Sequence, residues 1–435
     1  MSARNRELLA LVPASLLVTA GFAAVFIQRQ AVLSNVSLTY GAMFLGLCLL
    51  THIVLRFTLP HADPYLFPLV ALLASFGIVM IYRIKPSLAG HQALWFVLGL
   101  ALFALTIVVF RDYRRLERYR YTIAVIGLLL LVMPRVPGLG AQTNGAYLGI
   151  RIPVLGAFQP AEVAKIAIVI FLASYLRDTR QVLVLGARRF LGLTFPPLKQ
   201  LGPLLAVWGA SMLLLLVIRD LGSSLMFFGG FLAVLYVATN RASFVAVGVG
   251  LFAAGAWFLG THTPHVQDRV QAWLHPFKPA LYDKVGGSYQ LAQSLFAQGD
   301  GGLFGQGFGQ AILNLPHGQS LLPAPQTDLI YSVITDELGL FGACAVLLIF
   351  LLIVERGFRT ALLARDSFST LLATGLTSVL ALQVFVIVGG VTKVIPLTGV
   401  TLPFISYGGS SLVANFVLLA LLLLVSDRAR RPVSE

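Results

Sequence analysis

Long apolar runs constrain this chain more than any other feature of its sequence. A helix that crosses the hydrocarbon core of a bilayer needs about 20 mostly apolar residues. We expect spans near residues 8–27, 38–58, 65–83, 91–110, 120–134, 160–177, 202–218, 222–239, 243–260, 328–354, 368–390 and 404–426. Only 11% of the 435 residues are charged, against about 25% in soluble domains. The sequence therefore predicts an all-α polytopic membrane protein with twelve transmembrane helices.

Positive charge is spread unevenly over the segments that connect these spans. If both chain ends lie in the cytoplasm, the inner segments hold 20 Lys or Arg and the outer segments hold 10. Because cytoplasmic loops carry an excess of these residues, we expect both termini in the cytoplasm. These loops also account for the net charge of +14, and we expect no nucleic-acid partner. The same topology places residues 261–326 on the extracytoplasmic side, as a loop far longer than a connector requires.

Glu162 and Lys165 are ionisable residues at the start of one predicted span, where charge is costly and marks functional candidates. They are three residues apart and share a helix face. They form either a local ion pair near the interface or a cationic group directed into a polar cavity, and the two interpretations are compatible. No Walker A motif, zinc-ligand spacing or GxSxG motif occurs, which disfavours ATP-driven transport and Ser-His hydrolysis.

Three other segments interrupt the apolar pattern. Arg219 and Asp220, followed by Gly222, predict either a helix break that lines a cavity or an ordinary short turn. The segment "TDLIYSVITDELG" places one acid at the start of a predicted span and two acids within it. The segment "LPFISYGGSS" leads into the last predicted span. For the latter we favour a close-packed re-entrant turn over a cavity lining. The positions that we single out in these two segments are Thr327, Asp328, Glu337, Ser406, Gly408 and Gly409.

Within the long polar loop, the stretch "PALYDKVGGSYQLAQS" contains a single acid, Asp283. Taken alone, this acid predicts a surface ion pair with Lys284 or Lys278. The glycine-dense stretch 294–310 that follows predicts a compact loop folded over the membrane surface. A phosphate cradle is disfavoured because neither a strand before it nor a P-loop lysine after it is present.

Five motifs occur together in an order typical of one family. They are "NGAYLGIRIPVLGAFQPAEVAK", "DLGSSL", "SYQLAQSLFAQGDGGLFGQGFG", "TDLIYSVITDELGLFG" and "PLTGVTLPFISYGGSSL". From about residue 65 to its end, the chain resembles the SEDS family (shape, elongation, division and sporulation), which includes the RodA and FtsW glycosyltransferases. The resemblance implies a ten-helix core. We therefore divide the chain into an extra N-terminal helix pair, residues 1–60, and a catalytic membrane domain, residues 61–435, that includes the loop 261–326.

The catalytic acid of this family lies in the large outer loop, seven residues before the Gln of a Tyr-Gln pair. Counting back from Gln290 gives Asp283, so the resemblance implies that Asp283 is catalytic. Asp268 and Asp300 do not have this spacing. Departures from the family pattern are His275-Pro276, "PAPQTDL" at 323–329 and Lys393.

The resemblance implies a peptidoglycan glycosyltransferase that polymerises lipid II in the cytoplasmic membrane of a bacterium. Asp283 would be the general base for the acceptor 4-hydroxyl at an extracytoplasmic active site. Undecaprenyl pyrophosphate leaves as an anion, so cations or a bound metal would stabilise it. The residues expected to bind substrate or pyrophosphate are Lys165, Glu162, Arg151, Arg219, Lys393 and Gln290. No cofactor is required by the sequence, and a divalent cation, Mg²⁺ or Mn²⁺, is left open.

The resemblance also implies a partner, a class B penicillin-binding protein that crosslinks the new strands. A role in elongation, as for RodA, is favoured over division or sporulation. Two alternative functions are left open. The pair Glu162 and Lys165 suits the headgroup pathway of a lipid II flippase, and a non-catalytic scaffold for the cell-wall machinery is the third interpretation.

Overall fold

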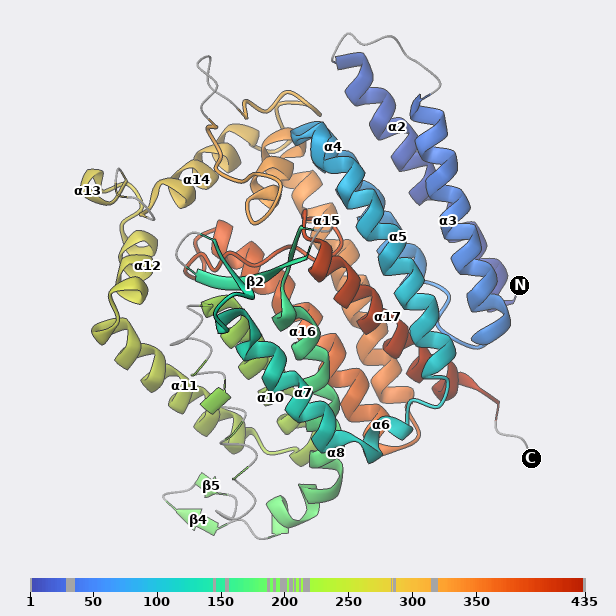
Figure 1. Ribbon diagram of the computed structural model, residues 1–435, viewed down its shortest axis with the longest axis vertical. Coiled ribbons are helices and arrows are strands. Elements are labelled where there is room, and N and C mark those ends of the chain that lie inside the picture. The colour runs from blue at the N-terminus through green and yellow to red at the C-terminus, as the bar shows by residue number, and fades with distance from the viewer. Residues whose placement is uncertain are drawn as a thin grey trace.

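The chain is mostly helical in the computed structural model (Figure 1). The structure describes residues 2–28, 36–143, 146–152, 156–185, 188–190, 193–195, 202, 206, 209–210, 213, 220–282, 284, 287–313 and 320–432. The helices are α1 (Ala3–Ala10), α2 (Val12–Gln28), α3 (Val36–Thr58), α4 (Leu66–Ile84), α5 (Pro86–Val109), α6 (Arg115–Arg118), α7 (Arg120–Val132), α8 (Pro160–Leu185), α10 (Leu221–Thr239), α11 (Ala242–His262), α12 (Pro264–Leu274), α13 (Pro279–Tyr282), α14 (Tyr289–Gly301), α15 (Ile330–Leu363), α16 (Ser367–Val391) and α17 (Gly409–Arg430).

Nine helical segments among the described residues are long and apolar enough to cross a membrane. They are Ala3–Ile27, Thr39–Thr58, α4, α5, Gly222–Thr239, α11, α15, α16 and α17. The predicted polytopic helical fold is confirmed. Of the other predicted spans, α7 has 13 residues, α8 is long but charged near both ends, and 202–218 falls largely outside the described residues. The count of twelve stays a prediction.

Short antiparallel strands, which the sequence analysis did not predict, lie in the connections on both sides of α8. The strands are β1 (Gly140–Thr143), β2 (Ala146–Ile152), β3 (Gly156–Phe158), β4 (Arg188–Phe190) and β5 (Leu193–Phe195). The first three form a sheet in the order β1-β2-β3, with Ile150 opposite both Gly140 and Phe158. Strands of three to seven residues are too short for a two-residue periodicity to identify them reliably.

The centre of the bundle is formed by α16 and α17, which are the most enclosed of the candidate spans. α17 packs against α5, and α16 packs against α15, α10 and α8. Both helices are apolar around most of their circumference, which is typical of a buried helix. The extra N-terminal helices flank this core, with α2 against α4 and α3 against α5 (Figure 1).

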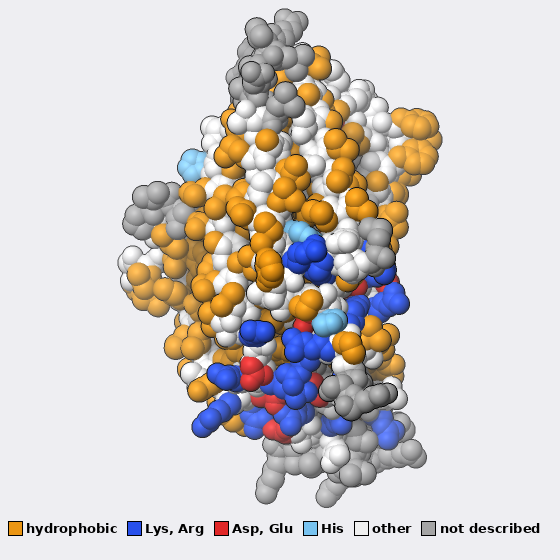
Figure 2. Space-filling model, turned by 90° about the vertical axis from the view of Figure 1, so that its right-hand side faces the viewer, with side chains coloured by type: hydrophobic (Ala, Val, Ile, Leu, Met, Phe, Trp, Pro, Cys, Tyr) orange, Lys and Arg blue, Asp and Glu red, His pale blue; other side chains and the backbone are white. Residues whose placement is uncertain are grey.

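One end of the bundle carries both chain termini, and we call it the terminus end. The turn between α3 and α4 lies there. The buried Asp63 carboxylate is 2.8 Å from Arg430 Nη2 and 3.5 Å from Arg356 Nη1, and Arg4 of α1 donates a hydrogen bond to the Ala62 carbonyl. Lys and Arg side chains gather toward this end, at the bottom of Figure 2, below a mostly apolar surface.

The opposite end carries the long loop, and we call it the loop end. Arg83, at the far end of α4, lies with its Nε 3.2 Å from Glu337 Oε1 of α15. The same guanidinium donates hydrogen bonds to the carbonyls of Gly309 and Ala311. α12, α13 and α14 therefore lie across the bundle from the termini (Figure 1).

Candidate functional site

The predicted catalytic residue Asp283 lies outside the described residues, as does Arg219, but the chain on both sides of Asp283 is described. Tyr282 accepts a hydrogen bond from Gln293 Nε2 (2.6 Å) and meets the Tyr289 ring edge to face, with 5.1 Å between centroids. The Tyr289 hydroxyl donates to the Leu321 carbonyl (3.2 Å). These contacts fasten the residue directly before Asp283 to α14. The role of Asp283 stays a prediction.

Lys284, which follows Asp283 in the sequence, forms an ion pair with Asp268 of α12. Lys284 Nζ lies 2.7 Å from Asp268 Oδ1, and both side chains are nearly half exposed. Such a pair contributes little to stability. The pair does occupy Lys284, which the sequence analysis had named as a possible ion-pair partner of Asp283. Gln290, in the first turn of α14, is half-buried.

Lys165 is the centre of a buried hydrogen-bond network between α8, α16 and α17. Its ammonium donates to Glu162 Oε2 (2.6 Å), Gln383 Oε1 (2.7 Å) and Asn415 Oδ1 (3.1 Å). A lysine ammonium has three donors, so all of them are used. Lys165 is 2% exposed and Glu162 is 6% exposed. The local ion pair considered in the sequence analysis is therefore present, within a larger network.

The sequence analysis missed Gln383 and Asn415, although a signal was present. Each is an amide side chain inside an otherwise apolar span, and buried polar groups need partners. Gln383 Nε2 also donates to the Thr401 carbonyl (3.1 Å) and to Ser411 Oγ (3.2 Å). Lys165 is one and a half turns from the start of α8, which is about 8 Å below the helix end. The network thus lies just inside the loop end.

A second charged cluster joins three segments that are distant in sequence. Asp220 caps α10 by accepting hydrogen bonds from the Ser223 backbone N–H (2.9 Å) and hydroxyl. Arg269 of α12 attracts both Asp220 and Asp328. Burial raises the pKa of Asp220, and the hydrogen bonds from Ser223 and the charge of Arg269 oppose that rise. Burial likewise raises the pKa of Asp328, against a hydrogen bond from Thr327 and the charge of Arg269.

The segment 397–401 separates this cluster from the Lys165 network and contacts both. Arg269 Nη1 donates to the Leu397 carbonyl (2.8 Å), while Gln383 donates to the carbonyl of Thr401. The hydroxyls of Thr398 and Thr401 are buried and have no hydrogen-bond partner among the described residues. Buried polar groups are nearly always hydrogen-bonded, so these two hydroxyls are candidates for contact with a ligand or with water. Segment 397–401 therefore lies between the two charged groups and accepts a hydrogen bond from each of them.

The turn before the last helix is tightly hydrogen-bonded. Ser406 Oγ donates to the Thr327 carbonyl (2.6 Å) and accepts from the Leu402 backbone N–H (2.9 Å). The Tyr407 N–H donates to the Gln326 carbonyl (2.8 Å). The structure thus has the close-packed turn that the sequence analysis favoured, and it ties the segment before α15 to the start of α17.

Three glycines that were singled out lie at close contacts. A Cβ atom on Gly222 would be 2.1 Å from Val400 Cγ2, and one on Gly409 would be 2.0 Å from the Trp95 ring. Gly408 has extended backbone, and its Cβ would meet Thr401 at 3.1 Å. The glycines therefore let α10 and α17 approach their neighbours, and their role is packing.

The glycine-dense stretch crosses α15 at a kink. Gly305 (φ +82°) and Gly339 (φ +65°) both have left-handed backbone. A Cβ on Gly305 would be 2.2 Å from the Glu337 carbonyl oxygen, and one on Gly339 would be 2.4 Å from the Gly305 nitrogen. The Leu340 N–H donates to the Gly302 carbonyl (2.9 Å) across the kink. Glu337, predicted as a cavity residue, is completely buried here and anchors this crossing together with Arg83.

Two predicted cations remain accessible at the loop end. Arg151 lies on β2 and Lys393 lies after α16, with a left-handed φ of +63°. Both are exposed, and within the described residues neither side chain has an ion pair or hydrogen bond. The Lys393 carbonyl accepts a hydrogen bond from Trp273 Nε1 (3.0 Å) of α12.

Comparison with known proteins agrees with the arrangement of these motifs. Residues 64–431 match the family described as cell cycle protein, which comprises FtsW, RodA and SpoVE proteins. The chain belongs to the SEDS family. This SEDS chain is 42% identical to the peptidoglycan glycosyltransferase RodA of Mycobacterium tuberculosis over 447 residues, which cover 99% of this chain and 92% of that protein. It is 33% identical to stage V sporulation protein E of Bacillus subtilis, over 85% of this chain and 98% of that protein.

A solved structure shows the same SEDS fold. A chain from a peptidoglycan synthase complex that coordinates polymerization and crosslinking superposes with a TM-score of 0.67 and 28% identity, over 85% of this chain and 99% of that chain. The favoured RodA-like assignment agrees with the mycobacterial relative, which matches the chain nearly from end to end.

The described residues do not form a metal site. No group of three or more His, Cys, Asp or Glu lies together among them. Asp220 and Asp328 already interact with the cation Arg269, and Asp220 accepts hydrogen bonds at both carboxylate oxygens. This donor set does not fit Mg²⁺ or Mn²⁺, which prefer several oxygen ligands. We derive no step through a metal, and the divalent cation that the sequence analysis left open is untested.

Proposed function

We propose that this SEDS protein is a peptidoglycan glycosyltransferase that polymerises lipid II on the outer side of a bacterial cytoplasmic membrane. The name of the mycobacterial relative supports the activity. The concentration of Lys and Arg toward the terminus end supports a cytoplasmic location for that end. The loop end would then face outward, where the sugar of lipid II lies above its membrane-embedded tail.

One observation carries the proposal most directly. The segment that flanks Asp283 is fastened to α14 at the end of the bundle that also holds the Asp220–Arg269–Asp328 cluster and the Lys165 network. A polymerase needs its base, its anion-binding groups and the lipid boundary within one substrate length. The position of these described features at the loop end supports the proposal.

In the proposed reaction the acceptor 4-hydroxyl attacks C1 of the donor sugar, and Asp283 accepts the hydroxyl proton. The bond from C1 to the pyrophosphate oxygen breaks, and undecaprenyl pyrophosphate leaves with both bonding electrons. This leaving group is an anion and needs no general acid, unlike the leaving group of a two-carboxylate hydrolase. Direct displacement inverts the anomeric centre and needs no covalent enzyme intermediate.

Arg151 and Lys393 are the best first contacts for the leaving pyrophosphate. Both are exposed cations at the loop end whose charges have no partner among the described residues. Lys165 has all three donors engaged, so its contact with pyrophosphate would require Gln383 or Asn415 to release it. We assign Arg151 and Lys393 to binding, Arg219 and Gln290 to further substrate contacts, and Lys165 with Glu162 to holding the inner wall.

The proposed partner is a class B penicillin-binding protein, which would crosslink the strands made here. The match to a chain of a peptidoglycan synthase complex supports such a partner.

The deciding experiment is lipid II polymerisation by the purified full chain, with and without its cognate transpeptidase. Asp283→Asn is expected to reduce the rate by about 100- to 10,000-fold, because a general base contributes this much. Asp268→Asn is the matched control: it removes a carboxylate of the same loop that already binds Lys284, and we expect a rate close to that of the wild type.

The same assay, together with a lipid transport assay, separates the alternatives. Wild-type polymerisation by Asp283→Asn would overturn the catalytic assignment. Transport of fluorescent lipid II across vesicles by a chain that makes no glycan, even with its partner, would favour a flippase. A chain that makes no glycan and transports no lipid II would support the scaffold interpretation.

A further inference from the structure

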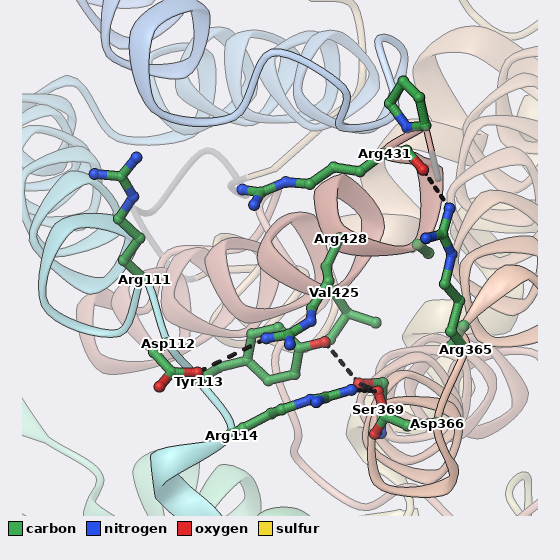
Figure 3. A pocket seen from close by; sticks show the side chains of 13 residues that line it. Arg111, Asp112, Tyr113, Arg114, Arg365, Asp366, Ser369, Val425, Arg428 and Arg431 are labelled. Carbon is green, nitrogen blue, oxygen red and sulfur yellow. Dashed lines mark hydrogen bonds and ion pairs between the residues drawn. The ribbon is translucent and has the colours of Figure 1, made fainter. Parts of the chain in front are cut away.

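A basic cavity opens at the terminus end, far from the candidate active site. It has a volume of about 530 Å³ and lies between the α5–α6 connection, the α15–α16 connection and the end of α17. Figure 3 shows the side chains that surround it. Its lining includes the arginines Arg111, Arg114, Arg365, Arg428 and Arg431. Nothing in the proposed glycosyltransferase mechanism uses these residues.

Acidic side chains neutralise only some of these arginines. Arg114 pairs with Asp366, Arg428 lies 3.7 Å from Asp112, and Arg431 lies 2.8 Å from Asp427. The two arginines left over have no acidic partner within the described residues. Arg365 donates only to the Arg431 carbonyl, and Arg111 makes no ion pair or hydrogen bond there. The lining holds five arginines and two acids, Asp112 and Asp366. When Asp427, which pairs with Arg431 but does not line the cavity, is counted as well, the net charge is about +2.

The walls of the cavity are fixed by buried contacts. Tyr113 is 1% exposed, and its hydroxyl lies 2.6 Å from Ser369 Oγ. Asp366 caps α16 by accepting from the Ser369 backbone N–H (3.0 Å) while it holds Arg114. The connections that carry Arg111 and Arg365 are thus tied to each other across the cavity, and in Figure 3 Arg431 extends toward the Arg111 side.

Exposed apolar side chains lead directly to the two unmatched arginines. Phe110, 37% exposed, precedes Arg111 at the end of α5, and Leu362, 85% exposed, lies three residues before Arg365 at the end of α15. Both helices are candidate spans. A molecule that contacts these apolar side chains and the arginines together must have a long apolar part and an anionic end.

We propose that this cavity binds the headgroup of an anionic phospholipid through its unmatched arginines, Arg111 and Arg365, with the acyl chains along the exposed ends of α5 and α15. Free phosphate has the same charge chemistry but would not use the apolar side chains. A smaller cavity of about 240 Å³ shares Arg365 and Asp366 and adds Arg180, which extends the basic surface for a larger headgroup. The proposal does not depend on the glycosyltransferase activity.

The test compares two double variants of the purified, delipidated full chain by native mass spectrometry in a nonionic detergent. R111Q/R365Q removes the two unmatched cavity arginines. R118Q/R359Q removes two exposed arginines of α6 and α15 that do not line the cavity. Dioleoyl phosphatidylglycerol and dioleoyl phosphatidylcholine are the probes, with sn-glycerol 3-phosphate as a competitor without acyl chains.

We expect phosphatidylglycerol to bind more tightly than phosphatidylcholine, with millimolar glycerol 3-phosphate unable to displace it. R111Q/R365Q should bind phosphatidylglycerol about 25-fold more weakly, because each basic residue near an anionic lipid contributes about fivefold. R118Q/R359Q should bind it as the wild type does. Equal losses in the two double variants would reduce the effect to general surface charge, and equal binding of the two lipids would exclude a headgroup site. Displacement by glycerol 3-phosphate would identify a free-anion site, and each of these three results overturns the proposal.

Discussion

The Lys165 network at the loop end and the basic cavity at the terminus end both hold cations near the membrane boundary, but the surrounding residues neutralise these cations to opposite extents. At the loop end, Lys165 is buried and each of its donors has an acceptor. At the terminus end, Arg111 and Arg365 are exposed beside a cavity, and no acid neutralises them within the described residues.

This difference separates two uses of charge in a membrane protein. A buried cation with every donor engaged fixes the relative positions of the helices that supply the acceptors. A cation that has no acidic partner, and that is held by rigid segments at the membrane interface, attracts an anion from outside the protein. The three predictions that follow test the packing and the charges of these two regions, from the largest expected effect to the smallest.

Lys165→Met should destabilise the chain by about 3 to 5 kcal/mol, because it leaves the Glu162 carboxylate buried without its cation. Thermal unfolding of the purified protein in detergent, followed by intrinsic fluorescence, measures the effect. The double variant E162Q/K165M removes both charges and should recover most of the loss. Lys393→Met, an exposed lysine of the same end, should stay within about 0.5 kcal/mol of the wild type. Wild-type stability of Lys165→Met would remove the contrast between the Lys165 network and the basic cavity.

Gly409→Ala should destabilise the chain by about 1 to 3 kcal/mol, since the added methyl group overlaps the Trp95 ring in a closely packed region. Gly90→Ala is the matched control in α5, where an added Cβ meets no atom within 4 Å. Its stability should equal or slightly exceed that of the wild type, because alanine favours the helix. The same unfolding measurement applies. A loss as large at Gly90 would mean that helix backbone effects, rather than packing at the loop end, cause the change.

Asp366→Asn should cost about 1 kcal/mol at pH 7, because it keeps a capping side chain but loses the ion pair with Arg114. Burial raises the pKa of Asp366, but hydrogen bonds from the Ser369 backbone and from Arg114 outweigh it and hold the pKa below its ordinary value of 3.8. The carboxylate therefore stabilises the fold above pH 3.8 and loses this effect as the pH falls through its folded pKa.

A pH series of unfolding midpoints checks this prediction. The gap between wild type and Asp366→Asn should be constant at neutral pH and should close in acid. Asp112→Asn, whose side chain is 52% exposed, should show a smaller gap at every pH. A gap that widens in acid would mean that folding raises the pKa of Asp366 instead of lowering it.

The sequence predicted the fold class well because apolar runs and charge bias are local properties of the chain. It also identified Glu162, Lys165, Asp220 and Asp328 as polar residues of interest. It did not predict the partners that define their environment. Gln383 and Asn415 meet Lys165 only through helix packing across 218 and 250 residues of sequence, and Arg269 joins two acids from other segments. Such pairings depend on how the helices are arranged in three dimensions, which residue spacing does not encode.

The short strands were missed for a different reason. Their hydrogen bonds form between connecting segments that carry no strong alternation, so the ladder depends on where α8 places its ends. The basic cavity was also not predicted. Its arginines were counted as loop charge, and only the folded chain shows which of them lack an acid.

The turn between α3 and α4 has a consequence for the order of assembly. Asp63 in this turn pairs with Arg430, which follows it by 367 residues. A ribosome that adds about 5 to 20 residues per second reaches Arg430 roughly 20 to 70 seconds after Asp63. Until then, this buried carboxylate lacks its nearest arginine, and the turn that joins the N-terminal helices to the core is incomplete. Helix α17, which carries Arg430, therefore closes a junction whose other side was made 367 residues earlier.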